Sequence, residues 1–265
     1  MRTFLTFVVG LVLAIGLTAC DSNDESPAQV RFIHASADAG VVDILVNGET
    51  VASGVSFSSL NGGVSDNPTV SDYYNVPVSS NTTIEVENSS GSVVTSTTAS
   101  EARLEGGERH TVLIAGATSA QQTDSPRAII LRDRFQASLG DSKVGIRLIH
   151  GSALAGAVDV YLTPPETDLQ NVDPLVSSFQ FTEDFPGNFA GQFAPQAVSQ
   201  DGSVISITKA GSKEAVFQLQ VGGDQGLQVS PGQYITGVAI DNPDDDLPEG
   251  ALPVGALVHV DSPGE

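Results

Sequence analysis

The chain has 265 residues and is strongly acidic, with 11 lysine and arginine residues against 32 aspartate and glutamate residues and a formal net charge of −21. Such a surface repels nucleic-acid phosphates, so the charge excludes a nucleic-acid-binding protein. The 27 glycines, the absence of tryptophan and the many serine, threonine and valine residues favour strands and turns over helices.

The chain begins with the order of parts of an export signal. One arginine precedes an uncharged apolar stretch, residues 4–17, and small residues stand just before Cys20. The apolar stretch is too short to span a hydrocarbon core of ~30 Å comfortably. We therefore interpret residues 1–19 as a removable signal peptide rather than a membrane anchor.

Residues 17–20, Leu-Thr-Ala-Cys, resemble the lipobox of bacterial lipoproteins, in which the cysteine receives a diacylglyceryl group and becomes the mature N-terminus. Cys20 is the only cysteine, so the chain offers it no disulfide partner. The resemblance implies a cell-envelope protein whose partner is the lipid bilayer, reached through acyl chains such as palmitate on Cys20, on the extracytoplasmic side. Asp21 is similar to an inner-membrane retention signal whose rule differs among bacteria, so the choice of membrane stays open. Residues 20–28 are polar and predict a disordered tether.

One motif occurs twice without a gap, because residues 30–44 recur as residues 146–160 at an offset of 116. The polar residues kept in both copies are Arg31, His34, Ser36 and Asp43 in the first and Arg147, His150, Ser152 and Asp159 in the second. Residues 107–115 and 126–131 parallel residues 232–240 and 254–259 less tightly. We therefore predict two copies of one module, residues 29–136 and residues 142–263.

Within each copy, short alternating runs are separated by turn residues every 8 to 12 positions, as the sequence shows. Residues 43–52 form a predicted hairpin about Asn47-Gly48, a pair that suits a turn with positive φ. Residues 82–96 and residues 203–221 predict two more hairpins. No capped amphipathic helix follows the signal peptide. We expect an all-β protein of two tandem antiparallel β-sandwiches, loosely immunoglobulin-like.

The spacing Arg-x-x-His-x-Ser-x-x-Ala-x-x-Val-Asp, early in a β module, resembles the domain of unknown function 4397 family. The resemblance covers nearly the whole mature chain as two copies. It implies a β-sandwich in secreted or anchored bacterial proteins, and it implies no established reaction, cofactor or partner. The second copy departs from the pattern, with Leu154 in the place of Asp38 and an insertion at residues 163–174.

The repeated histidine, serine and aspartate have the side chains of a nucleophilic triad. On a strand, however, His34 and Ser36 would share an otherwise apolar face with Phe32. We therefore favour buried structural histidines whose ring nitrogens bond a backbone or carboxylate group, and we predict no catalytic residue. Arg31 and Arg147 would lie on the opposite face. There they would either recognise a carboxylate or phosphate or, as we favour, form a salt bridge to an acid of the same module.

Metal and cofactor sites have little support. Four scattered histidines and no usable thiol do not favour zinc. The weak calcium candidates are the loop residues Asp241, Asp244, Asp245 and Asp246, although we favour a solvated acidic loop. No glycine-rich phosphate loop opens a helix, so we expect no nucleotide cofactor.

Five of the 11 phenylalanines fall within fifteen residues. They are Phe179, Phe181, Phe185, Phe189 and Phe193. Exposed, they would form a docking patch, but we favour core filling and a loop lid. By this interpretation Phe193 takes the place of Tyr74 in the first copy.

The leading hypothesis is a non-enzymatic envelope lipoprotein that binds or scaffolds another envelope component, a protein or a polysaccharide, without a cofactor. One alternative is a hydrolase that uses the His/Ser/Asp set. The other is a calcium-stabilised surface adhesion module.

Overall fold

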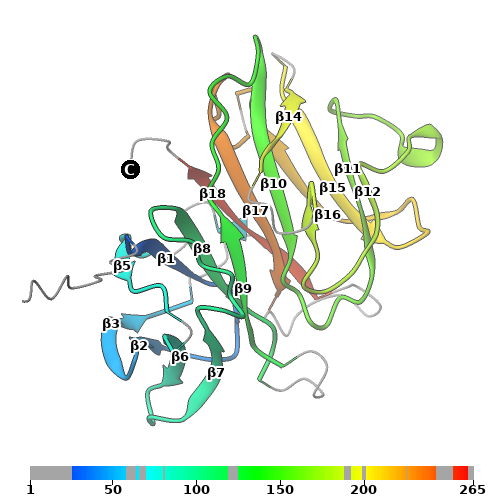
Figure 1. The fold of residues 1–265 in the computed structure, drawn as a ribbon. Coiled ribbons are helices and arrows are strands. Elements are labelled where there is room, and N and C mark those ends of the chain that lie inside the picture. The colour runs from blue at the N-terminus through cyan, green and yellow to red at the C-terminus, as the bar shows by residue number, and fades with distance from the viewer. Residues whose placement is uncertain are drawn as a thin grey trace, which may run out of the picture.

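The computed structural model describes residues 26–57, 64–65, 70–79, 81–118, 125–187, 192–198, 201–224, 226–242 and 253–261 (Figure 1). The predicted signal peptide, Cys20 and most of the predicted tether lie outside these residues. The described chain is all-β, as the sequence predicts, with no α-helix and a short 3-10 helix η1 (Leu169–Asn171). Within these ranges, no helix is long and apolar enough to cross a membrane.

The first half of the chain forms two sheets packed face to face. Sheet A has the order β5 (Tyr74–Val76), β1 (Ala28–His34), β8 (Arg109–Ala115) and β9 (Arg127–Arg132). Sheet B has the order β3 (Glu49–Val55), β2 (Val42–Val46), β6 (Thr83–Asn88) and β7 (Val93–Thr98). Alternate residues of each strand, such as Val30 and Phe32 on β1 and Ile44 on β2, form the core between them.

The second half repeats this arrangement. Sheet C contains β13 (Asp184–Phe185), β10 (Lys143–His150), β17 (Tyr234–Asp241) and β18 (Val254–Asp261), with β14 (Ala194–Ala197) also paired to β10. Sheet D contains β12 (Val176–Phe179), β11 (Val158–Thr163), β15 (Ser203–Lys209) and β16 (Ala215–Val221). Strands β10, β11, β17 and β18 therefore hold the places of β1, β2, β8 and β9. Strand β4 (Val64–Ser65) crosses over from the first half to pair with β18.

We expected purely antiparallel sheets. Instead, β1 pairs parallel with β8, and β10 pairs parallel with β17. Between β1 and β8 the chain enters sheet B twice, and between these visits it forms β4 on sheet C and β5 on sheet A. It can therefore re-enter sheet A at the end where β1 began. The expected hairpins do form, and Asn47 and Gly48 have φ values of 54° and 78° in the first of them.

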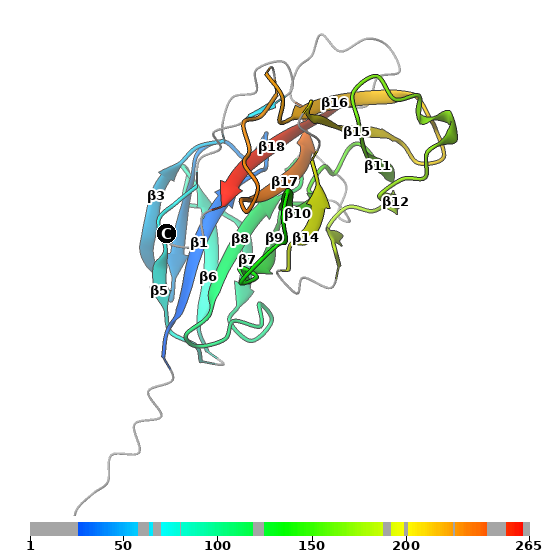
Figure 2. The same ribbon diagram turned by 90° about the horizontal axis from the view of Figure 1, so that it is seen from above.

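The four sheets stack in the order B, A, C, D, and Figure 2 shows sheet D on the far side of sheet C from sheets A and B. Besides the cores inside the two sandwiches, the outer faces of sheets A and C meet in a third apolar core. Its members include Ile33, Leu113, Ile129, Leu131, Ile149, Val238, Ile240 and Leu257. Each half thus buries a face of its central sheet against the other half.

This shared core predicts that the two halves unfold together. We expect Ile149→Ala to lower the free energy of unfolding by about 2–5 kcal/mol, because it opens a cavity at the A–C interface. Urea denaturation followed by circular dichroism should show one transition in the parent and in the variant. Val93→Ala, at a side chain that is 55% exposed, is the control and should change little. Two separate transitions, with only one of them shifted, would contradict this expectation.

Candidate functional site

The two histidines of the repeated motif are buried at the ends of β1 and β10. His34 Nε2 lies 2.8 Å from the carbonyl oxygen of Gly40, and His150 Nε2 lies 2.8 Å from that of Gly156. A carbonyl only accepts, so Nε2 carries the proton in both rings. Both glycines have positive φ, which turns their carbonyls toward the imidazoles. Each imidazole therefore ties its strand to the loop that follows.

Burial lowers the pKa of His34 and of His150, and the bonds to the two glycine carbonyls only partly oppose this. Both imidazoles are thus held neutral inside the sandwich.

The serines and aspartates of the motif do not join the histidines in a triad. Asp43 Oδ1 accepts from the Gly54 N–H at 2.8 Å, and Asp159 Oδ1 accepts from the Ser178 N–H at 2.7 Å. These donors occupy matching places on β3 and β12, both with positive φ. Among the described residues, neither motif aspartate nor either serine hydroxyl bonds to a motif imidazole. The motif aspartates fix edge strands instead.

Asp241, one calcium candidate, is bound by protein donors. Its carboxylate accepts from the Ser152 hydroxyl at 2.5 Å and from the backbone N–H groups of Ala153 and Leu154. Burial raises the pKa of Asp241, although these bonds oppose that shift. Asp244, Asp245 and Asp246 lie outside the described residues. In the part of the chain that is described, no three histidine, cysteine, aspartate or glutamate side chains gather in a way that could hold a metal ion.

The phenylalanine cluster is largely internal. Phe179 lies in the core between sheets C and D, where Phe185 packs from its edge, and Phe181 packs against the A–C interface. Phe193 is fully buried, and Phe189 lies outside the described residues. The strand registers pair Tyr74 with Val30 and Ala194 with Ile146. Phe193 therefore matches Tyr73, one residue away from the counterpart we expected.

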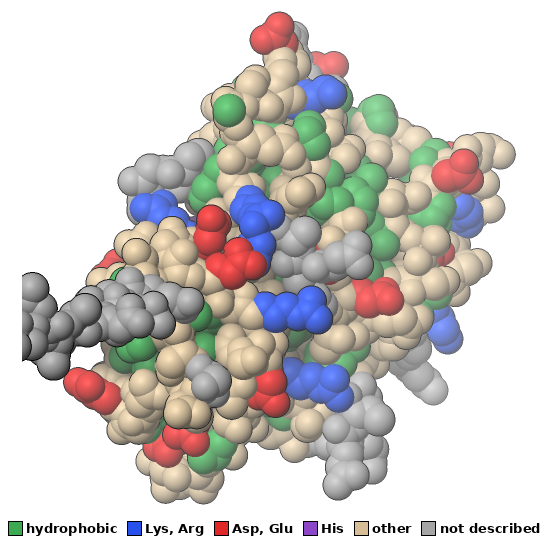
Figure 3. Space-filling view, viewed as in Figure 1, with side chains coloured by type: hydrophobic (Ala, Val, Ile, Leu, Met, Phe, Trp, Pro, Cys, Tyr) green, Lys and Arg blue, Asp and Glu red, His purple; other side chains and the backbone are tan. Residues whose placement is uncertain are grey.

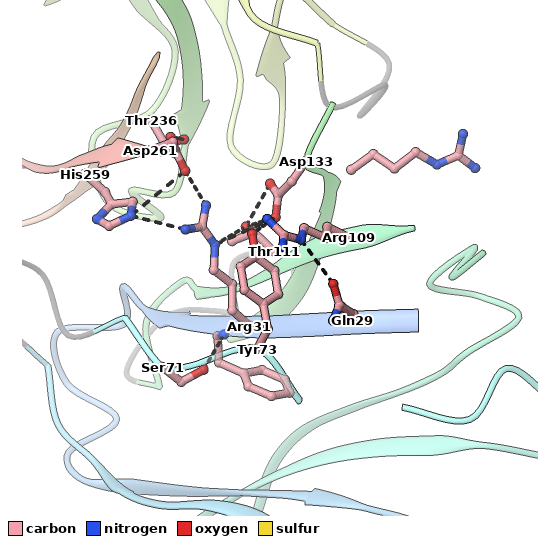
Figure 4. Close-up of polar contacts among 12 residues, drawn as sticks. Gln29, Arg31, Ser71, Tyr73, Arg109, Thr111, Asp133, Thr236, His259 and Asp261 are labelled. Atoms are coloured by element: carbon pink, nitrogen blue, oxygen red, sulfur yellow. Dashed lines mark hydrogen bonds and ion pairs between the residues drawn. The ribbon is translucent and has the colours of Figure 1, made fainter. Parts of the chain in front are cut away.

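The motif arginines form two crossed ion pairs at the A–C interface, and Figure 4 shows the one made by Arg31. Arg31 forms an ion pair with Asp261, the last residue of β18, and Arg147 Nη1 lies 3.0 Å from Asp133 Oδ1, just after β9. We expected an acid of the same module, and Arg31 Nε does lie 3.7 Å from Asp133 Oδ2 of its own half. The closer aspartate instead comes from the other half, because both arginines leave their strands on the face that packs against that half.

Each arginine of the crossed pairs also contacts a threonine hydroxyl and an aromatic ring. Arg31 Nε donates to Thr111 Oγ1 at 2.9 Å, and Arg147 Nη2 donates to Thr236 Oγ1 at 2.9 Å. Each threonine hydroxyl in turn contacts the aspartate of its own half. The guanidinium of Arg31 lies 5.2 Å from the ring centroid of Tyr73, and that of Arg147 lies 4.6 Å from the ring centroid of Phe193.

Burial would raise the pKa of Asp133. The guanidinium groups of Arg147 and Arg31 and the hydroxyls of Thr111 and Tyr73 nevertheless hold it below its ordinary value. The carboxylate is therefore charged at neutral pH. The two halves are thus connected by a buried network of ion pairs.

A second polar feature was not anticipated from the sequence. A cavity of about 590 Å³ runs along β9, the edge strand of sheet A, and we call it the β9 groove. Its polar lining residues are Glu101, Arg103, His110, Arg127, Arg132, Arg134 and Thr182. The groove thus holds four of the 11 lysine and arginine residues of a chain with a net charge of −21. Figure 3 shows basic side chains near the centre of the view, with acidic side chains among them.

One wall of the groove is partly exposed, and the opposite wall is buried. Glu105 forms ion pairs with Arg132 and Arg134, whose side chains are 20% and 44% exposed. His110 is buried on the inner wall, and neither ring nitrogen has a hydrogen-bond partner among the described residues. Burial lowers the pKa of His110.

One signal in the sequence could have revealed the groove. The strand registers align His110 with Ile235 and Arg132 with Val260, because each pair of residues holds the same cross-strand position. The second half therefore keeps the same strand pairing with apolar residues in the places of His110 and Arg132.

A comparison with family models gives one match, to a domain of unknown function (DUF4397), over residues 28–161. This range begins with β1 and ends within β11. No curated protein matches the chain.

The buried neutral histidines make stability depend on pH. Their pKa values are lowered in the folded state from about 6.5, so the unfolded chain binds protons first as the pH falls. Stability should therefore be complete above pH of about 6.5 and decline below it. In denaturation measured across this range, His34→Gln combined with His150→Gln should flatten the slope. His34→Ala should cost about 2–5 kcal/mol at neutral pH. An unchanged stability of the alanine variant would contradict the buried position.

The crossed ion pairs can be tested by removing one charge. We expect Asp133→Asn to cost about 3–5 kcal/mol in unfolding free energy, because it leaves Arg147 buried without its counter-charge. Glu105→Gln removes a more exposed partner and should cost no more than about 1 kcal/mol. If denaturation shows that the two variants lose the same unfolding free energy, the stabilising function of the crossed ion pairs is contradicted.

Proposed function

The chain belongs to the DUF4397 family, and from this premise we propose that it is a non-enzymatic cell-envelope lipoprotein. In this proposal, two copies of one module, residues 29–136 and residues 142–263, are held on the extracytoplasmic side of a bacterial membrane by acyl chains on Cys20. There the protein binds or scaffolds another envelope component.

The observation that carries the non-enzymatic part is the internal use of the repeated motif. The imidazoles of His34 and His150 are buried and bond backbone carbonyls, and Asp43 and Asp159 bond backbone N–H groups of edge strands. A hydrolase needs nucleophile, base and acid to converge on space that a substrate can enter. The motif geometry offers no such convergence, so it favours a structural function for these residues.

The two-copy part rests on matched geometry. Strand order, the parallel pairing of the first and eighth strands and the histidine-to-glycine bond are the same in both halves. The stacked sheets share an apolar core and crossed ion pairs, an arrangement that suits a scaffold. The β9 groove, which the fold itself does not require, is the surface that best fits a binding site.

Lipidation can be tested with Cys20→Ser. We expect the parent to partition with membranes and its N-terminal peptide to carry the mass of a diacylglyceryl-modified cysteine, because two acyl chains anchor firmly. The variant should move to the soluble fraction after export. Ser22→Ala, two residues further on, is the matched control and should stay with the membrane. A parent protein without the added mass would contradict the anchor.

Binding can be tested separately by crosslinking in intact cells. We expect specific crosslinks to lipid, protein or polysaccharide that persist in a folded His34→Gln variant, because that histidine is internal. A parent protein that yields no specific crosslink would contradict a binding or scaffolding function.

A further inference from the structure

We propose that the β9 groove binds the phosphate groups of anionic lipid headgroups in the membrane that carries the protein, and thereby fixes the orientation of the molecule on that membrane. This inference rests on the proposed lipid anchor and names a ligand for the proposed binding site.

The first step is the place where the tether leaves the fold. The backbone of Ser26 lies against Gly106, and the Gly107 N–H donates to the Pro27 carbonyl at 3.1 Å. These glycines belong to the connection between β7 and β8, which also contains Arg103 and Glu105. Cys20 precedes Ser26 by six residues, and an extended chain of that length spans about 20 Å. An anchor at Cys20 would keep this end of the molecule close to the headgroups.

The second step is the charge at that end. Strand β9 runs antiparallel to β8, so it ends where β8 begins, and Arg132 and Arg134 lie beside the β7–β8 connection. Glu105 contacts both of them. Arg103, Arg132 and Arg134 therefore place three guanidinium groups near the tether exit. The carboxylates of Glu101 and Glu105 offset part of that charge, on a chain that is strongly acidic as a whole. Elsewhere the net negative charge repels anionic lipids, and screening over about 8 Å confines that repulsion to surfaces that approach closely.

The third step is the chemistry of the groove. A guanidinium group presents paired N–H donors that match two phosphate oxygens. Within the described part of the chain, neither ring nitrogen of His110 has a hydrogen bond of normal geometry, and an anionic oxygen that enters the cavity would accept one from the ring N–H. Ile235 and Val260 hold the places of His110 and Arg132 in the second half, so the same fold forms without these groups. The charged residues therefore need an explanation other than folding.

The experiment uses the mature chain coupled through Cys20, its only cysteine, to a maleimide lipid. Hydrogen exchange is compared on vesicles of phosphatidylcholine alone and on vesicles of phosphatidylcholine mixed with phosphatidylglycerol. We expect exchange at residues 100–108 and 127–134 to be about tenfold slower on the anionic vesicles. Each basic residue near such a surface strengthens association roughly fivefold, and Glu101 and Glu105 offset part of this. The hairpin at residues 203–221, on sheet D, should not change.

A charge-matched pair of variants isolates the groove. Arg103→Gln with Arg134→Gln should abolish the slowing, and Lys143→Gln with Lys209→Gln, at two exposed lysines outside the groove, should preserve it. Equal exchange on both kinds of vesicle, or equal loss in both variants, would overturn the proposal.

A second arm separates the two sources of phosphate. Inorganic phosphate is added to the Cys20→Ser chain in the absence of vesicles. Slowing by inorganic phosphate with no difference between vesicle types would assign the groove to a free anion and overturn the lipid proposal. Lipidation in cells is measured independently by mass, so failure of the groove and failure of the anchor give different results.

Discussion

The crossed arginine–aspartate pairs are the constraint on which the four-layer arrangement depends. A buried guanidinium must be paired, and each half of the chain supplies an arginine whose closest carboxylate belongs to the other half. Apolar side chains around the pairs exclude water and would pack almost as well with small displacements. The ion pairs tolerate such displacements poorly, because their hydrogen bonds have narrow geometric limits. The apolar contacts supply most of the stability of the interface, and the polar network sets its register.

Comparison of the two halves separates residues that the fold needs from residues that are free to change. The histidine-to-glycine bond and the aspartate that fixes an edge strand are kept in both. The carboxylate that binds backbone near the end of the sandwich comes from a different sequence position in each half. In the first half Asp38 Oδ1 accepts from the Thr118 N–H at 2.8 Å, whereas in the second half Leu154 replaces it and Asp241 binds the loop. The local need for an acceptor persists while its position in the sequence changes.

Much of the fold could be predicted from the sequence because it depends on local rules. The period of two placed His34 and Arg31 on opposite faces of one strand, and the Asn47-Gly48 turn located a hairpin. The parallel pairing and the crossed aspartates could not be predicted, since they depend on strands distant in sequence. The β9 groove was missed for a related reason. Arg127 and Arg132 lie on opposite faces of β9 and Arg103 lies in a connection, so only the edge position of the strand brings them together.

The positions of the tether and the groove explain how weak contacts could have a large effect on orientation. A few partly paired arginines give low affinity for a membrane from solution, particularly on a chain with a net charge of −21. If the chain is anchored as we propose, a tether that leaves the fold beside Gly106 would raise the local concentration of headgroups at the adjacent arginines without any new contact. The acyl chains would then attach the protein to the membrane, and the arginines would set its orientation there. With that face toward the lipid, the acidic remainder of the surface points into the surrounding space, where its charge repels other anionic surfaces.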